Sequence, residues 1–161
     1  MRRRILAVAA AVSLALVGCS SQGVELDREV EVAGLTVSVP SGWAEDRSED
    51  YADDYGFGTR SYESGDPDSD DYGRIDLYYS ESSDETPESY IEGLYGKGMD
   101  YEIEDGPVID GVQTQVCKYL FEDSDTELTD VFIYGPDMHY RISLYGEAID
   151  AERILETVEI E

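Results

Sequence analysis

The sequence predicts an α+β domain built on an antiparallel sheet. Several segments alternate apolar and polar residues with period two, which is the pattern of a strand with one buried face. Only short turn-rich stretches separate the last three of these segments, and this spacing favours an antiparallel meander. Two further segments carry apolar residues at helical spacing. Together these patterns predict strands as the main elements and two short helices beside them.

The N-terminal segment has the pattern of a bacterial lipoprotein signal peptide. Arg2-Arg3-Arg4 precedes an apolar stretch over residues 5–17, and Leu16-Val17-Gly18-Cys19 has the form of a lipobox. As a helix the apolar stretch spans about 20 Å, which is short of a hydrocarbon core of about 30 Å. We therefore predict cleavage before Cys19 and lipidation of its thiol. The twin arginines also resemble a twin-arginine export signal, so the export route stays open.

These features predict the organisation of the whole chain. Residues 1–18 form the signal peptide, residues 19–29 the lipidated cysteine and a tether, and residues 30–161 one globular domain. A diacylglycerol thioether and an N-terminal acyl group such as palmitate supply more than one lipid chain, and stable anchoring needs about two such signals. We expect the protein on the outer face of the cytoplasmic membrane, anchored by its lipid.

The charge balance limits the possible partners. The chain has 38 acidic and 11 basic residues, and its formal net charge is −27. Nucleic-acid binding depends on clustered Lys and Arg, so we expect no nucleic-acid partner. The same excess of acid disfavours contact between the body of the domain and anionic headgroups. We interpret the acidity as a solvated surface, of the kind that suits a salty habitat, with a specific cation site or a basic-partner site as the alternatives.

Two strands are predicted near the start of the globular domain. Residues 35–39 alternate apolar and polar side chains, and Val30 and Val32 show the same pattern just before them. The segment Pro40-Ser41-Gly42-Trp43 then supplies turn residues, and we expect the Trp43 ring to fold back onto the core.

Residues 44–73 have a different character, because acidic residues, glycines and tyrosines replace the alternating pattern. Here we predict a variable region with a short strand at residues 57–62 and a loop at residues 64–71. The alternation resumes at residues 74–80, which are predicted to form a strand.

A helix is predicted over residues 87–95. Thr86 suits the N-cap position, Pro87 suits the first helical position, and acidic residues follow in the first turn. Its apolar stripe consists of Tyr90, Ile91, Leu94 and Tyr95.

Four strands and a second helix complete the domain. The strands are predicted at residues 101–104, 112–121, 128–134 and 139–145. We expect Asp150 to cap the final helix, with Ile154, Leu155 and Val158 as its buried stripe.

Candidate catalytic residues are few. Cys117 lies in a predicted strand and has no disulfide partner once Cys19 is lipidated, so we predict a buried thiol, with Lys118 on the opposite face. His139 is the single histidine and is predicted at a strand start, as a surface or edge residue. No nucleophile elbow, phosphate-binding glycine loop or zinc pattern occurs in the sequence. We therefore expect no enzyme, and no catalytic residue is assigned.

One acidic segment is a candidate metal site. Asp66, Asp68 and Asp70 place carboxylates at alternate positions, as at the start of a calcium loop. The sixth position is Asp71 instead of glycine and the twelfth is Leu77 instead of glutamate, so this is not an EF-hand. The alternatives are a solvated loop and a calcium site. Apart from calcium, no cofactor is expected.

Three segments carry a resemblance to a known family. The segments Val39-Pro40-Ser41-Gly42-Trp43, Pro87-Glu88-Ser89-Tyr90-Ile91 and Ile154-Leu155-Glu156-Thr157-Val158, in this order of elements, resemble the PsbP-like families, including actinobacterial LpqN-type lipoproteins. The resemblance spans residues 30–160. It implies an α/β/α sandwich, in which helices flank a curved antiparallel sheet. It also implies a binder or assembly factor, because members include an extrinsic photosystem subunit and a nuclear-import factor.

The leading hypothesis is a non-enzymatic, membrane-tethered binding or accessory domain. It would present an acidic, tyrosine-rich surface to a protein or cell-envelope partner. One alternative is a calcium-responsive domain that uses the acidic loop at residues 66–71. Another is an envelope hydrolase with a carboxylate pair, which needs a deep cleft that holds two acids with perturbed pKa values.

Overall fold

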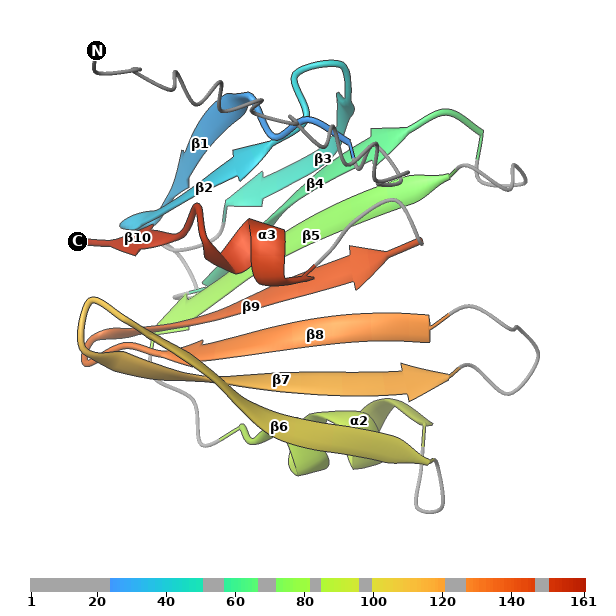
Figure 1. The fold of residues 1–161 in the computed structure, drawn as a ribbon. Helices are drawn as coiled ribbons and strands as arrows, with labels where there is room; N and C mark the ends of the chain where they lie inside the picture. Colours follow the sequence, from blue (N-terminus) through green and yellow to red (C-terminus); the bar gives the residue numbers. More distant parts are fainter. Residues whose placement is uncertain are drawn as a thin grey trace, which may run out of the picture.

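The computed structural model describes residues 24–50, 57–66, 72–81, 85–95, 100–120, 127–146 and 151–161. Within these residues, seven antiparallel strands form a curved sheet in the order β3-β4-β5-β9-β8-β7-β6 (Figure 1). The strands are β3 (Ala44–Asp50), β4 (Phe57–Ser64), β5 (Gly73–Glu81), β6 (Tyr101–Ile109), β7 (Val112–Leu120), β8 (Glu127–Tyr134) and β9 (Met138–Tyr145). A smaller sheet has the order β1-β2-β10, with β1 (Arg28–Val32), β2 (Leu35–Val39) and β10 (Glu159–Ile160).

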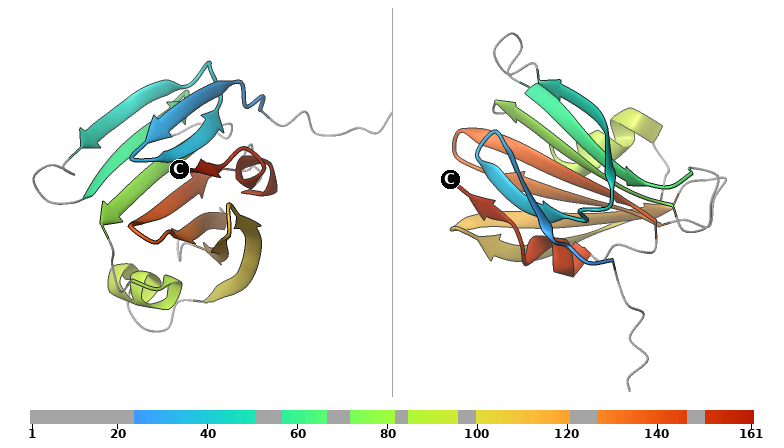
Figure 2. Two further views of the ribbon diagram at one scale, coloured as in Figure 1. Left: turned by 90° about the vertical axis from the view of Figure 1, so that its left-hand side faces the viewer. Right: turned by 90° about the horizontal axis from the view of Figure 1, so that it is seen from above.

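Two short helices lie on opposite sides of the large sheet (Figure 2). The helix α3 (Ala151–Leu155) and the small sheet cover one face, whereas α2 (Pro87–Tyr95) lies on the other. The predicted α+β architecture with a curved antiparallel sheet between helices is therefore confirmed. We call the side that carries α2 the α2 face of the sheet.

The larger hydrophobic cluster lies between the two sheets. It contains Leu35, Val37 and Val39 of β2 together with residues of β5, β8 and β9. The Tyr140 hydroxyl donates a hydrogen bond to the Ala33 carbonyl at 2.8 Å and so ties the β1-β2 turn to the large sheet. Trp43 is buried in this cluster, as predicted, because the turn that begins at Pro40 directs its ring inward.

The smaller cluster joins α2 to the sheet. Ile91 is its fully buried helical residue, and it packs in one cluster with Cys117, Tyr119, Leu128 and Phe132. The predicted N-cap is present. The Ser89 amide donates to Thr86 Oγ1 at 3.2 Å and the Thr86 amide donates to Ser89 Oγ at 2.8 Å.

The residues given for both clusters all lie within residues 24–161. We therefore expect this part of the chain to fold on its own. Among the described residues, no helix has the length and apolar character needed to span a membrane.

Two predictions of secondary structure were wrong. Residues 44–50 were predicted within a variable loop region, but they form the edge strand β3, which pairs with β4. The final helix was predicted to include Val158, but α3 ends at Leu155. Its end is fixed by Thr157, whose hydroxyl donates to the Ile154 carbonyl at 2.8 Å and accepts from the Ser38 amide at 3.0 Å. The chain then continues as β10, paired with β2.

Other element boundaries differ by a few residues. The strand predicted at residues 101–104 continues to Ile109 through a register shift between Asp105 and Val108. At the N-terminal side, β1 begins at Arg28, and Val24 and Leu26 pack against the larger cluster. Ordered packing thus begins within the stretch that was predicted as a tether.

Candidate ligand pocket on the α2 face

A row of buried polar side chains crosses the α2 face. Strand register places Ser61, Asp76, Ser143, Asp130 and Cys117 directly beside one another on five neighbouring strands. All five side chains are buried. Period-two alternation explains the row, because Ile75, Leu77, Ile142 and Leu144, which flank Asp76 and Ser143, belong to the larger cluster on the other side of the sheet. The α2 face therefore contains polar groups that must find partners within the protein.

Asp76 has a charged partner. Arg74 Nε lies 2.9 Å from Asp76 Oδ1 and 3.1 Å from Oδ2, so the guanidinium binds both carboxylate oxygens. The same guanidinium donates to Ser61 Oγ at 3.2 Å and lies 3.4 Å from a Glu63 oxygen. The charge of Asp76 is thus compensated although its side chain is buried.

Asp130 lacks such a partner. The Tyr119 hydroxyl donates to Asp130 Oδ2 at 3.0 Å, whereas Oδ1 is buried without a hydrogen-bond partner. Burial raises the pKa of Asp130 above its ordinary value, and the nearby Ser143, Arg141 and Tyr119 offset only part of this shift. The same row therefore holds two buried carboxylates in opposite electrostatic situations, because Asp76 is paired with a cation and Asp130 is not.

Cys117 is a buried thiol, in agreement with its predicted position on a strand. Burial, with smaller contributions from Asp130 and Glu88, raises the pKa of Cys117 to about 12. Lys118 instead lies 2.9 Å from a Glu104 oxygen through its Nζ atom. A thiol with so high a pKa carries almost no thiolate near neutral pH.

The next row contains an arginine held between two aromatic rings. Register places Tyr78 and Phe132 on either side of Arg141. The Arg141 Cζ atom lies 4.2 Å from the Tyr78 ring centroid and 3.7 Å from that of Tyr90, which comes from α2. Such contacts are favourable cation–π interactions. They leave only 14% of the Arg141 side chain exposed, and its Nη1 lies 3.4 Å from Glu85 Oε2.

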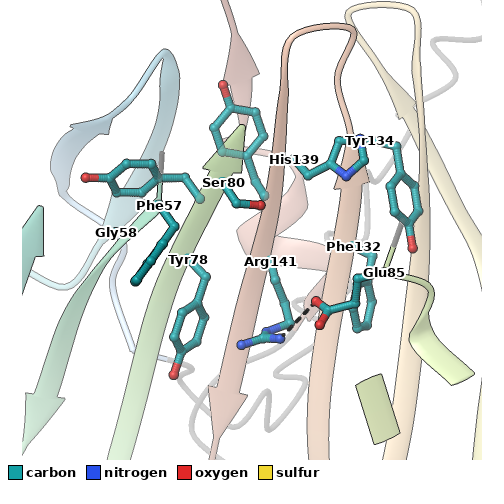
Figure 3. A pocket seen from close by; sticks show the side chains of 11 residues that line it. Phe57, Gly58, Tyr78, Ser80, Glu85, Phe132, Tyr134, His139 and Arg141 are labelled. Carbon is teal, nitrogen blue, oxygen red and sulfur yellow. Dashed lines mark hydrogen bonds and ion pairs between the residues drawn. The ribbon is translucent and has the colours of Figure 1, made fainter. Parts of the chain in front are cut away.

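A pocket of about 330 Å³ opens above this arginine (Figure 3). It is lined by Phe57, Gly58, Tyr78, Tyr79, Ser80, Glu85, Phe132, Tyr134, His139, Tyr140 and Arg141. Its volume lies at the lower end of the range of small-molecule pockets, about 300–1,000 Å³. Phe57 stands at the pocket with 49% of its side chain exposed. Such an arrangement of aromatic walls and one cation is suited to binding a small amphipathic group.

The far wall of the pocket holds His139. Its ring meets that of Tyr134 edge to face, with centroids 5.2 Å apart. Ser80 lies directly opposite His139 in the register of β5 and β9. Burial raises the pKa of Tyr134 to about 12, and its hydroxyl oxygen is buried without a hydrogen-bond partner.

Comparisons with known proteins bear on the fold. No protein-family model matches the sequence, and no curated protein is similar to it at a significant level. The solution structure of cyanobacterial PsbP (CyanoP) from Synechocystis sp. PCC 6803 is similar, with a TM-score of 0.53. The likeness covers 91% of this chain and 99% of that chain. The chain has a PsbP-like fold. The sequence identity is 11%, so the likeness establishes the fold alone.

The pocket of this PsbP-like fold was not predicted from the sequence. His139 was predicted as a surface or edge residue at a strand start; it is partly buried near the start of β9 and also forms part of the pocket wall. Phe57, Glu85 and Arg141 were not singled out. The sequence did contain one signal for the pocket. Alternation in the two strands predicted at residues 74–80 and 139–145 places polar residues on one face of each strand, and the two strands pair in the sheet.

The pocket does not bring two acidic side chains together. Glu85 is the single carboxylate among its lining residues. Asp76 and Asp130 are buried on the same face of the sheet but do not line the pocket. The pocket described here is therefore not the two-acid cleft that the hydrolase alternative requires.

Two sets of predicted site residues stay predictions. Cys19 lies outside the described residues, and so do Asp68 and Asp70 of the predicted calcium loop. Asp66 is described, at the edge of that loop. In the part of the chain that the structure describes, no group of three or more His, Cys, Asp or Glu side chains is placed to hold a metal ion.

Proposed function

We propose that the chain is a lipid-anchored, extracytoplasmic binding domain of the LpqN type, with a non-enzymatic accessory role. Cys19 would hold it on the outer face of the cytoplasmic membrane, and the acidic, tyrosine-rich domain would face a protein or cell-envelope partner. The pocket on the α2 face would be its recognition site. Calcium binding by the loop at residues 66–71 is retained as an alternative property of the same domain.

The pocket itself is the observation that carries this proposal. It combines an exposed aromatic side chain, Phe57, with a largely buried cation, Arg141. Several buried polar atoms without hydrogen-bond partners gather on the same face of the sheet. They are Thr59 Oγ1, Asp130 Oδ1, Tyr134 Oη, Arg141 Nε and Ser143 Oγ. Natural domains keep few such atoms, and two of these five, Tyr134 Oη and Arg141 Nε, belong to residues that line the pocket, where a bound ligand would supply partners.

The membrane anchor can be tested through its cysteine. Because the lipid is attached through the Cys19 thiol, Cys19→Ser is expected to move the protein from the membrane fraction to the aqueous fraction. Cys117→Ala is the matched control, since Cys117 is a buried core thiol, and it should stay with the membrane. A Cys19→Ser chain that still fractionates with membranes would contradict the anchor.

Binding at the pocket can be tested with two exposed apolar residues. Phe57 lies at the pocket, whereas Val108, 62% exposed, lies on β6 outside it. In a nuclear magnetic resonance screen of residues 20–161 with small compounds, we expect shifts to gather at the lining residues. Phe57→Ala should weaken binding about fivefold or more, because about 1 kcal/mol of apolar contact is lost.

The matched variant Val108→Ala should bind as the parent chain does. Shifts that gather on another surface, or equal effects of the two substitutions, would contradict the proposed site. Reproducible turnover of a hydrolysable compound that is lost in His139→Ala would contradict the non-enzymatic role, because His139 is the histidine at the pocket.

A further inference from the structure

We propose that the pocket selects a small organic ligand that carries one carboxylate on an aromatic or apolar body, and that this carboxylate takes the place of Glu85 on Arg141. The inference rests on the proposed function, since it names the class of ligand for the same pocket. It follows from the placement of Arg141, the weakness of its internal partner, the character of the walls and the charge of the chain.

Arg141 is held ready for an anion. The rings of Tyr78 and Tyr90 lie against its guanidinium and fix the side chain without neutralising it. Planar guanidinium groups bind carboxylates through paired, charge-assisted hydrogen bonds. Because the ring contacts have already fixed the rotamer, a carboxylate that binds here would cost less side-chain entropy than at a free surface arginine.

Glu85 shows that Arg141 binds a carboxylate. Its Oε2 atom lies 3.4 Å from Arg141 Nη1, which is long for a charge-assisted hydrogen bond of about 2.7–2.9 Å. The Glu85 side chain is also 45% exposed, so water competes for it. A long ion pair with one partner this exposed contributes little to stability. An external carboxylate with additional contacts can therefore displace Glu85 at low cost.

The walls supply those additional contacts. Tyr78 and Phe132 offer rings beside the arginine, and Phe57 adds a ring farther along the pocket, as Figure 3 shows. The volume of about 330 Å³ admits a small molecule and excludes a bulky one. A flat aromatic or short aliphatic body fits this lining best, because its burial adds the hydrophobic term that Glu85 does not bring.

The overall charge argues for a ligand with one negative charge. With a formal net charge of −27, the chain repels a dianion such as a phosphate monoester more strongly than a monoanion. A cationic ligand is attracted from a distance but meets the guanidinium of Arg141 inside the pocket. A monocarboxylate avoids both the stronger repulsion of a dianion and the repulsion between a cation and Arg141.

Paired compounds test this selection. Residues 20–161, labelled with ¹⁵N, would be titrated with phenylacetate, indole-3-acetate and hexanoate, each against its neutral primary amide, and with phenyl phosphate as a dianion. We expect the best carboxylate to bind at least tenfold more tightly than its amide and than phenyl phosphate. The backbone amides of lining residues and the Arg141 Nε–H group should report the binding.

Three variants separate the contributions of Arg141, of Glu85 and of net charge to carboxylate binding. Arg141→Gln should reduce the affinity for the carboxylate at least tenfold and leave that for the amide nearly unchanged. Glu85→Gln should raise the affinity for the carboxylate about threefold, because it removes the internal competitor. The matched control is Glu29→Gln, on the exposed side of β1, which changes the net charge equally and should have no such effect.

The outcomes distinguish this inference from the proposed function. Amides that bind at the pocket as tightly as their carboxylates would overturn the carboxylate selection and leave the pocket as a binding site. Compounds that do not perturb the lining residues at all would overturn both. If Arg141→Gln fails to fold, Glu85→Gln decides alone, and an unchanged affinity for the carboxylate in that variant would overturn the inference.

Discussion

Asp76→Asn is expected to destabilise the domain by about 3 kcal/mol at neutral pH. Asp76 is buried and binds the Arg74 guanidinium through both oxygens, at 2.9 and 3.1 Å. Removal of one partner from a buried ion pair leaves the other charge uncompensated, at a cost of about 3–5 kcal/mol. Arg74 is partly exposed and keeps a Glu63 oxygen at 3.4 Å, so the lower end of that range applies.

Asp130→Asn is the matched change, and it should have the opposite sign. Asp130 belongs to the same polar row but has no cationic side chain bonded to it, and burial raises its pKa. Its ionised form is therefore disfavoured in the folded state. The asparagine keeps an oxygen that can accept the Tyr119 hydroxyl, so we expect stabilisation of roughly 1 kcal/mol at neutral pH.

The pH dependence follows from the same shift. A carboxyl group with a raised folded-state pKa binds more protons when folded than when unfolded, over the range between the two pKa values. Its contribution to the free energy of unfolding therefore falls as the pH rises from the unfolded-state value through the folded-state value, and then stays low. Asp130→Asn should abolish the share of this decline in the free energy of unfolding that comes from Asp130.

Urea unfolding of the parent chain and both variants, at several values between about pH 4 and pH 8, measures these effects together. The account of the polar row requires opposite signs for the two substitutions at neutral pH. Equal destabilisation by Asp76→Asn and Asp130→Asn would contradict it, as would an Asp130→Asn chain that keeps the full pH dependence of the parent.

Ile91→Ala is expected to destabilise the domain by about 2–4 kcal/mol. Ile91 is fully buried and anchors α2 to the smaller cluster, and loss of a large aliphatic side chain from a core costs about 2–5 kcal/mol. The neighbouring Tyr90 contributes a ring to Arg141. A loosened helix should therefore also weaken ligand binding at the pocket.

Gly93→Ala in the same helix is the control. Gly93 is exposed, and a Cβ atom there would meet nothing within 4 Å. Because glycine disfavours the helix interior, this change should stabilise the domain by about 0.5–1 kcal/mol. Thermal unfolding compares the two variants directly. An Ile91→Ala chain as stable as the parent would show that α2 does not hold this part of the fold.

Much of the fold could be predicted from local patterns. Alternation located the strands with a clear buried face, and the Thr86 cap located the start of α2. The edge strand β3 could not be found in this way. Its residues Glu45, Asp46, Glu49 and Asp50 show no apolar alternation, and it forms by pairing with β4 on one side. Similarly, β10 depends on β2, which lies more than a hundred residues earlier in the chain.

The pocket could not be predicted from the sequence for a related reason. Its walls come from β4, β5, β8 and β9, and the neighbouring positions of Tyr78, Phe132 and Arg141 depend on strand register. The sequence predicted strands but not their order, and it did not place α2 on the face that contains the polar row. The raised pKa of Asp130 follows from the burial of its side chain on the α2 face. Nothing in the sequence indicates that burial.

A crystal structure with bound compound would show whether the α2 face of this PsbP-like domain carries a ligand pocket. Crystals of residues 20–161 would be soaked with the compound that binds best in solution. We expect density for the compound beside Phe57 and Tyr78, with its polar end toward Arg141 in place of Glu85. Density for the compound on another surface, with Glu85 still on Arg141 and the pocket unfilled, would contradict it.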